Sequence, residues 1–111
     1  MVKKELVKEV GSQEFNKIIK EVKGLVICDF YATWCMPCVM MAPVMESLAE
    51  KNKTIKFIKV NVDESQELAE KYEISSIPCI VFIKGEEEVD RLVGAVNENL
   101  LQEKIKDYLK V

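Results

Sequence analysis

The sequence contains no histidine, and it lacks both a long apolar run and a long basic run. Without histidine, the commonest metal ligand and proton shuttle near neutral pH is missing, so cysteine–histidine protease chemistry is excluded. The net charge of −3 offers no electrostatic footprint for nucleic acid or for an anionic membrane surface. The first residues also lack the apolar stretch of a signal peptide. We therefore expect a soluble, cytoplasmic protein that binds neither nucleic acid nor membranes.

The length of 111 residues and the 49% apolar content are sufficient for one domain with a single core. No linker or internal repeat divides the chain, so we expect one domain over residues 1–111 and a monomer. Four cysteines in a cytoplasmic chain are more typical of catalysis or metal binding than of a structural disulfide framework. Cysteine chemistry is therefore the first function to consider.

Hydrophobic periodicity predicts alternating strands and helices. We expect strands near 7–10, 25–31, 55–62, 80–83 and 89–93, and helices marked by apolar residues within 15–22, 40–49, 68–72 and 100–109. Ser12 is expected to cap the first helix, Gly24 to end it, and Pro43 to kink the second helix. The acidic run 86–88 is interpreted as a solvated turn after Gly85. The order β-α-β-α-β-α-β-β-α predicts an α/β fold with a mixed five-stranded sheet and helices on both faces.

The motif Trp34-Cys35-Met36-Pro37-Cys38 lies where a buried strand gives way to an amphipathic helix. Disulfide exchange needs a thiolate, and the unpaired N–H groups and positive dipole end of a helix N-terminus stabilise one. Pro37 fits the first helical turn because it has no N–H to leave unsatisfied. We therefore expect Cys35 to be the nucleophile.

Cys38 lies three residues further along the same helix, close enough to form a small ring with Cys35 and more shielded from solvent. It is the natural resolving thiol, which attacks Cys35 in a mixed disulfide and releases the product. Asp29, a carboxylate in an apolar strand, should have a raised pKa and is the candidate proton acceptor. Lys59 is its expected partner. The alternative is a satisfied buried polar pair with no kinetic role.

A lone C-x-x-C motif has two other interpretations, half of a zinc site or a pair of core cysteines. A structural zinc site usually needs four ligands in two close pairs. Cys28 and Cys79 are isolated in the sequence, and no histidine completes such a set. The sequence therefore favours a redox-active dithiol and no metal.

Taken together, the strand Leu25–Ala32, the W-C-M-P-C motif, Ile77-Pro78 and Val93-Gly94-Ala95 resemble the thioredoxin family over essentially the whole chain. The resemblance implies a thioredoxin fold and a protein disulfide oxidoreductase that reduces protein disulfides by dithiol–disulfide exchange. It implies catalytic roles for Cys35, Cys38, Asp29 and Lys59. It also implies electron delivery by a separate thioredoxin reductase. No nucleotide-binding loop is present, so we expect no organic cofactor.

The resemblance further implies a substrate-binding surface beside the dithiol. Its expected members are Trp34, Met36, Pro37, Ile77, Pro78 and Gly94, with Pro78 after a cis peptide bond and Asp63 at the border. For Trp34 the alternative is a core aromatic. For Pro78 and Gly94 it is a simple turn or strand breaker.

Three residues depart from the family pattern. Met36 replaces a glycine between the cysteines, Tyr31 stands where tryptophan is common, and Cys79 replaces the usual threonine after the proline. The residues between the cysteines tune thiolate stability, so Met36 leaves the reduction potential undetermined by the sequence. An oxidase, an isomerase or a glutaredoxin-like enzyme is therefore an alternative to a reductant. A non-catalytic binding module is a further alternative. Cys28 and Cys79 are either independent buried thiols or a second disulfide.

Overall fold

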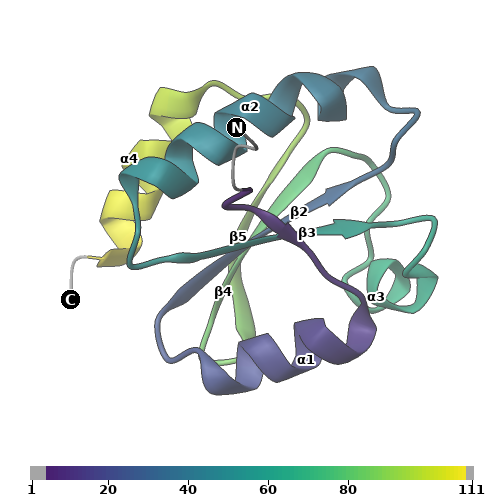
Figure 1. The fold of residues 1–111 in the computed structure, drawn as a ribbon, viewed down its shortest axis with the longest axis horizontal. Coiled ribbons are helices and arrows are strands. Elements are labelled where there is room, and N and C mark those ends of the chain that lie inside the picture. Colours follow the sequence, from purple (N-terminus) through teal and green to yellow (C-terminus); the bar gives the residue numbers. More distant parts are fainter. Residues whose placement is uncertain (1–4, 110–111) are drawn as a thin grey trace.

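The computed structural model describes residues 5–109 and confirms the predicted element order (Figure 1). The elements are β1 (Lys8–Glu9), α1 (Ser12–Glu21), β2 (Leu25–Tyr31), α2 (Met36–Lys51), β3 (Lys56–Asn61), α3 (Gln66–Lys71), β4 (Cys79–Lys84), β5 (Glu87–Val93) and α4 (Glu98–Leu109). No helix within residues 5–109 is long and apolar enough to cross a membrane.

The five strands form one mixed sheet in the order β1-β3-β2-β4-β5. The pairs β1–β3 and β2–β3 are parallel, whereas β4 runs antiparallel to both β2 and β5. Helices α2 and α4 cover one face of the sheet, and α1 and α3 cover the other (Figure 1). The fold is therefore the three-layer α/β arrangement that the sequence predicts.

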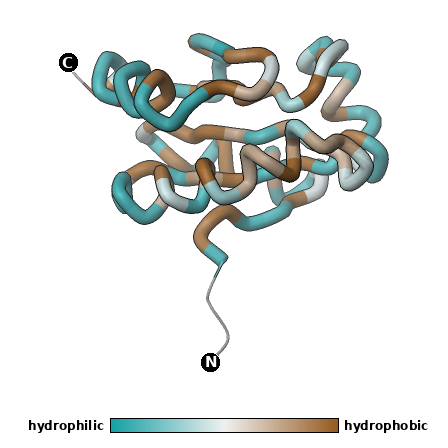
Figure 2. Tube along the Cα trace, turned by 90° about the horizontal axis from the view of Figure 1, so that it is seen from above, coloured by the Kyte–Doolittle hydropathy of each residue, from teal (hydrophilic) through white to brown (hydrophobic). Residues whose placement is uncertain are grey.

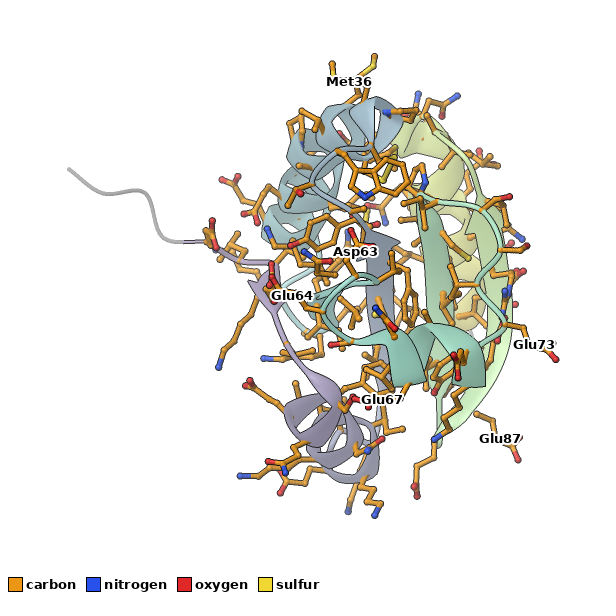
Figure 3. All side chains as sticks on the ribbon, turned by 90° about the vertical axis from the view of Figure 1, so that its right-hand side faces the viewer. Met36, Asp63, Glu64, Glu67, Glu73 and Glu87 are labelled. Atoms are coloured by element: carbon orange, nitrogen blue, oxygen red, sulfur yellow. A yellow bond between two sulfur atoms is a disulfide. The ribbon has the colours of Figure 1, made fainter. Side chains whose placement is uncertain are left out.

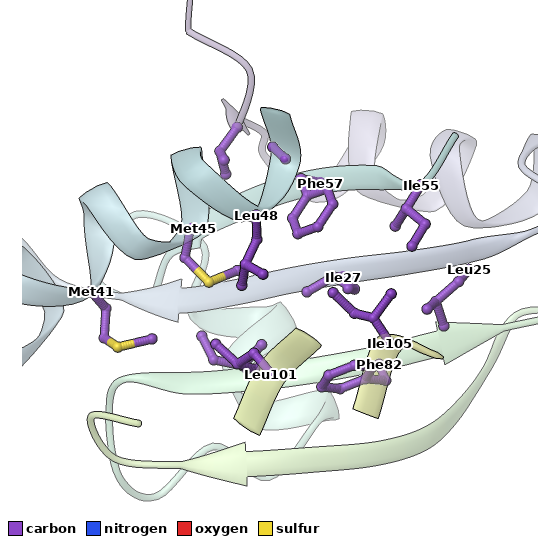
Figure 4. Packing of buried hydrophobic residues seen from close by; sticks show 13 residues of the cluster. Leu25, Ile27, Met41, Met45, Leu48, Ile55, Phe57, Phe82, Leu101 and Ile105 are labelled. Carbon is purple, nitrogen blue, oxygen red and sulfur yellow. The ribbon is translucent and has the colours of Figure 1, made fainter. Parts of the chain in front are cut away.

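Each face of the sheet has its own apolar core because side chains alternate along a strand. The residues of β2 alternate between the two cores. Leu25 and Ile27 face α2 and α4, whereas Val26, Cys28 and Phe30 face α1 and α3. Figure 4 shows the first core, where Met41, Met45 and Leu48 of α2 pack over the sheet beside Leu101 and Ile105 of α4. The central strands accordingly appear hydrophobic between more hydrophilic outer segments (Figure 2). Asp29 lies two residues after Ile27 in β2, so its side chain points to the same face of the sheet, under α2.

The expected boundaries of α1 were wrong at both ends. Gly11 is the N-cap, and Ser12 is the first helical residue, because its hydroxyl donates to a carboxylate oxygen of Glu67 instead of capping the backbone. The helix ends at Glu21, and the N–H of Val22 donates to the carbonyl of Ile18. Gly24 therefore lies beyond the end of the helix.

The acidic run after Gly85 is only partly a turn. Gly85 and Glu86 form the hairpin turn with positive φ angles of 61° and 69°. Glu87 and Glu88 already belong to β5, and Glu88 forms an ion pair with Arg91, with Nε and Oε2 separated by 2.5 Å. The ion pair with Arg91, and not solvent alone, therefore stabilises the Glu88 carboxylate in β5.

Two other expectations differ in detail. On α4, Leu101 and Ile105 are buried, but Leu100 and Leu109 are exposed. Pro43 does lie inside α2, and the kink there stays a prediction.

Candidate active site

The two cysteines of the C-x-x-C motif are joined as a disulfide at the start of α2, with their Cα atoms 5.2 Å apart. Cys35 is the N-cap of the helix, and Pro37 occupies its first turn. The backbone N–H of Cys38 donates to the sulfur of Cys35 at 3.3 Å. This is the helix N-terminal setting that lowers the pKa of a thiol, because the unpaired N–H groups stabilise negative charge on sulfur.

Burial does not separate the two cysteines as the sequence suggested. Cys35 is 5% exposed and Cys38 is 4% exposed. Both pack in a small apolar cluster with Ala32, bordered by Tyr31, Val62 and Ile77. The chemical difference between them therefore comes from their positions on the helix, since only Cys35 Sγ accepts the helical N–H bond.

Trp34 is a surface residue and not a core aromatic, because 69% of it is exposed beside the dithiol. Its indole N–H donates to a carboxylate oxygen of Asp63 at 2.8 Å. Asp63 follows β3, where its own N–H donates to the side-chain oxygen of Asn61 at 2.9 Å. Asp63, labelled in Figure 3, therefore lies at the border of the site and anchors the indole of Trp34.

The opposite border of the site is the loop before β4, where the Ile77–Pro78 peptide bond is cis as expected. The carbonyl oxygen of Ile77 lies 3.9 Å from the sulfur of Cys35. Gly94, just after β5 rather than inside it, donates its N–H to the carbonyl of Pro78 at 2.8 Å. Pro78 itself is buried, and Ile77 and Gly94 are half-buried. Trp34 and Met36, which flank Cys35 in the sequence, are both exposed.

Asp29 is a buried carboxylate at the middle of the sheet, with one oxygen, Oδ1, that has no hydrogen-bond partner. Burial raises the pKa of Asp29 to about 7, and the positive charge of Lys59 opposes that shift. Lys59 sits opposite Asp29 in the register of β2 and β3. Within residues 5–109 the two form no ion pair, and the Lys59 ammonium lies 5.6 Å from the centre of the Tyr31 ring. The interpretation as a satisfied buried pair does not fit this geometry.

A half-open cavity of about 750 Å³ runs behind α2 and connects these groups. Asp29, Cys38 and Lys59 line it together, and Val39, Ala42 and Pro43 of α2 form part of its apolar wall. The cavity therefore places the second cysteine and the unpaired carboxylate against a common space.

Cys28 and Cys79 are both buried free thiols. In the β2–β4 register Cys28 pairs with Val81, and Cys79 pairs with Phe30, so the two cysteines are diagonal neighbours rather than direct partners. Burial raises the pKa of both thiols. The second disulfide is therefore absent, and neither thiol is activated as a nucleophile near neutral pH.

Metal binding gains no support from the structure. Across residues 5–109, no group of three or more Cys, Asp or Glu side chains is arranged to hold a metal ion.

The apolar residues within 40–49 that predict this helix do not all face the core. Met40 is 68% exposed. The buried stripe instead follows Cys38, Met41, Met45 and Leu48, at spacings of three and four residues. The signal that separates the two faces is Cys38, whose position was known, because Met40 lies only two residues after it and therefore on another face.

Known proteins share both the sequence pattern and the fold. The thioredoxin family model matches residues 6–107. The thioredoxin of Echinococcus granulosus is 40% identical over 91% of this chain and 92% of its own, and that of Chlamydia caviae is 43% identical over 86% and 92%. The solved structure of a mutant thioredoxin from Halobacterium salinarum NRC-1 has a TM-score of 0.88 at 33% identity and covers 100% of this chain and 97% of that one.

Proposed function

The chain belongs to the thioredoxin family and is a dithiol–disulfide oxidoreductase, and from this premise we propose that it works as a reductant of protein disulfides. The observation that carries the proposal is the Cys35–Cys38 disulfide at the N-terminus of α2, with the N–H of Cys38 donated to the sulfur of Cys35. That hydrogen bond favours negative charge on Cys35, which makes it the attacking thiolate and the better leaving group.

In the proposed cycle the reduced protein begins with a Cys35 thiolate and a Cys38 thiol. The Cys35 sulfur attacks one sulfur of the substrate disulfide, which forms a mixed disulfide and expels the other substrate sulfur as a thiolate. Cys38 then loses its proton and attacks the Cys35 sulfur, so the second substrate thiolate leaves. The substrate gains two electrons, and the protein ends as the Cys35–Cys38 disulfide.

Asp29 is proposed to accept the Cys38 proton in the second step. A pKa of about 7 lets this carboxyl group exchange protons near neutral pH. Oδ1 is free of other hydrogen bonds, and Asp29 shares the cavity behind α2 with Cys38. Lys59, on the same cavity, is proposed to moderate the carboxyl pKa, because its positive charge lowers it.

The substrate is proposed to dock around Trp34, Met36, Pro37, Ile77, Pro78 and Gly94. The carbonyl of Ile77, 3.9 Å from the attacking sulfur, can accept a strand-like hydrogen bond from an extended segment. Trp34, fixed by Asp63, supplies an exposed aromatic face at the same place.

We propose that electrons come from a separate thioredoxin reductase and that the protein acts as a cytoplasmic, monomeric electron carrier in cell redox homeostasis. The supporting observation is the Cys35–Cys38 dithiol itself, which can be reduced by another dithiol through the same exchange reaction.

Serine substitutions of the cysteines test the cycle. Cys35→Ser should abolish reduction of insulin disulfides in the presence of dithiothreitol, because the attacking sulfur is gone. Cys38→Ser should leave the first attack intact and accumulate mixed disulfides, which intact-protein mass spectrometry detects as an added substrate mass.

Cys79→Ser is the matched control, since this thiol is buried and free, and it should retain turnover. If Cys35→Ser reduced insulin as fast as the unaltered protein, the proposed cycle would be wrong.

A further inference from the structure

The first ten residues of α2 carry no charged side chain on any face. From Met36 to Met45 every residue is apolar, and Glu46 is the first charge in the helix. A surface helix normally places polar residues on the side away from the core. In α1 of the same chain the exposed positions are indeed polar: Gln13, Asn16, Lys17, Lys20 and Glu21. The core therefore explains only the inner face of the start of α2.

The outer face is exposed as well as apolar. Met36 is 67% exposed, Val39 is 51% exposed and Met40 is 68% exposed. Their spacing of three and four residues puts them side by side on the helix. Met36 directly follows Cys35 and projects outward from the end of α2 (Figure 3). We call these three residues the α2 outer patch.

A protein substrate must come close to this patch to react. Cys35 is only 5% exposed, so a substrate sulfur that bonds to it has to be pressed against the neighbouring surface. Because α2 begins directly after Cys35, the α2 outer patch lies next to the surface that a bound substrate contacts. The two exposed methionines are unbranched and flexible, so they can fit side chains of different shape.

We propose that the α2 outer patch extends the docking surface beside the dithiol and binds apolar residues flanking the reacting disulfide of a protein substrate. This inference rests on the proposed reductant function: Met36 already belongs to the proposed docking surface, and Val39 and Met40 add a specificity determinant outside the groove formed by Trp34, Ile77 and Gly94. Met40 and Val39 contact no reacting atom, and their role is to select substrates with apolar flanking segments.

The test compares a protein disulfide with a small disulfide that has no flanking chain. Pre-reduced protein is mixed with excess insulin or with bis(2-hydroxyethyl) disulfide, and the single-turnover rate is followed by Trp34 fluorescence. Met40→Gln removes apolar character at nearly constant shape. Leu109→Gln is the control, because Leu109 is 51% exposed on α4, outside the patch.

Met40→Gln should lower the insulin rate constant about threefold to tenfold, a typical range for losing one apolar contact at an interface. The small disulfide should react equally with Met40→Gln and with the unaltered protein, and Leu109→Gln should match the unaltered protein on both substrates. Unchanged insulin rates would overturn the proposal, and so would equal losses on both substrates, since these would mean that Met40 acts through the dithiol.

Two further outcomes would overturn the proposal for other reasons. If sedimentation shows that the unaltered protein is a dimer and that Met40→Gln makes it a monomer, the patch joins two copies of the chain and does not bind substrate. If the unaltered protein reduces the small disulfide but not insulin, the proposed function fails independently of the patch.

Discussion

At the scale of single residues, Asp29 makes the clearest prediction about pH. Burial raises the pKa of its carboxyl group from 3.8 to about 7, and the charge of Lys59 opposes part of that shift. A raised acid pKa stabilises the fold below the unfolded-state pKa, and that contribution is lost as the pH rises through the folded-state pKa. At pH 8 the charged carboxylate should therefore destabilise the fold by roughly 4 kcal/mol relative to pH 3.

Asp29→Asn should remove this penalty, because an amide stays neutral at every pH. The free energy of unfolding in urea should exceed that of the unaltered protein at pH 8, and the difference should shrink steadily as the pH falls from 7 towards 4. A constant difference between pH 4 and 8 would contradict the raised pKa.

The same substitution tests the proton-transfer role. Without the carboxylate, resolution of the mixed disulfide by Cys38 should slow by about a hundredfold near pH 7, the low end of what general-base catalysis contributes. The first attack by Cys35 should be nearly unchanged. Quenched-flow separation of the two steps measures both rates, and equal resolution rates across neutral pH would show that Asp29 has no such role.

At the scale of elements, the β4–β5 hairpin contains a strained turn. Both Gly85 and Glu86 have positive φ, a conformation that costs a non-glycine residue about 1 kcal/mol. Glu86→Gly should therefore stabilise the protein by up to about 1 kcal/mol in urea unfolding. Glu87→Gly, one residue later in β5, should instead destabilise it, because glycine weakens a strand. A loss of stability in Glu86→Gly would contradict the strained turn.

The segment before β1 is attached to α2 by one carboxylate. The two oxygens of Glu46 accept the N–H groups of Leu6 and Val7, each at 3.0 Å, and Val7 is buried in the core below. Glu46→Ala should cost about 1 kcal/mol of stability, since it leaves the part-buried N–H of Val7 without its partner, whereas the exposed N–H of Leu6 can bond to water. The amides of Leu6 and Val7 should also exchange faster with deuterium.

Glu50→Ala is the control for this attachment. Glu50 lies one turn further along α2, and within residues 5–109 its side chain forms no hydrogen bond or ion pair. If the amides of Leu6 and Val7 exchanged with deuterium at the same rate in Glu46→Ala and Glu50→Ala, Glu46 would not hold the segment before β1.

Elements with one clear pattern were predictable, and those that depend on distant partners were not. The run Leu25–Tyr31 matches β2 at both ends, because a central strand buried on both faces must be apolar throughout. Ser12 was misassigned because its hydroxyl bonds to Glu67, which is far away in the sequence. The exposure of Met40 was missed because a helix start that is apolar all round gives periodicity no polar face to detect.

At the scale of the whole molecule, the order of the elements was sufficient to predict the mixed sheet and its two helical layers. The dithiol and its helix N-terminus were also predictable, since the motif and the strand–helix junction are local features. The cavity that joins Cys38 and Asp29 was not, because it depends on how α2 lies over β2 and β3. The same limit applies to the free Oδ1 of Asp29, which only the packed structure reveals.

The direction of electron flow is a property of the complete molecule, because it depends on how the fold stabilises the reduced and oxidised dithiol. The most direct test is the reduction potential of the Cys35–Cys38 pair, measured by equilibration with glutathione buffers and followed by Trp34 fluorescence. A difference of about 30 mV corresponds to a tenfold change in the exchange equilibrium. A potential well below that of the glutathione pool is the result we predict for a reductant. A potential well above it would contradict that function and would make the protein an oxidant or isomerase.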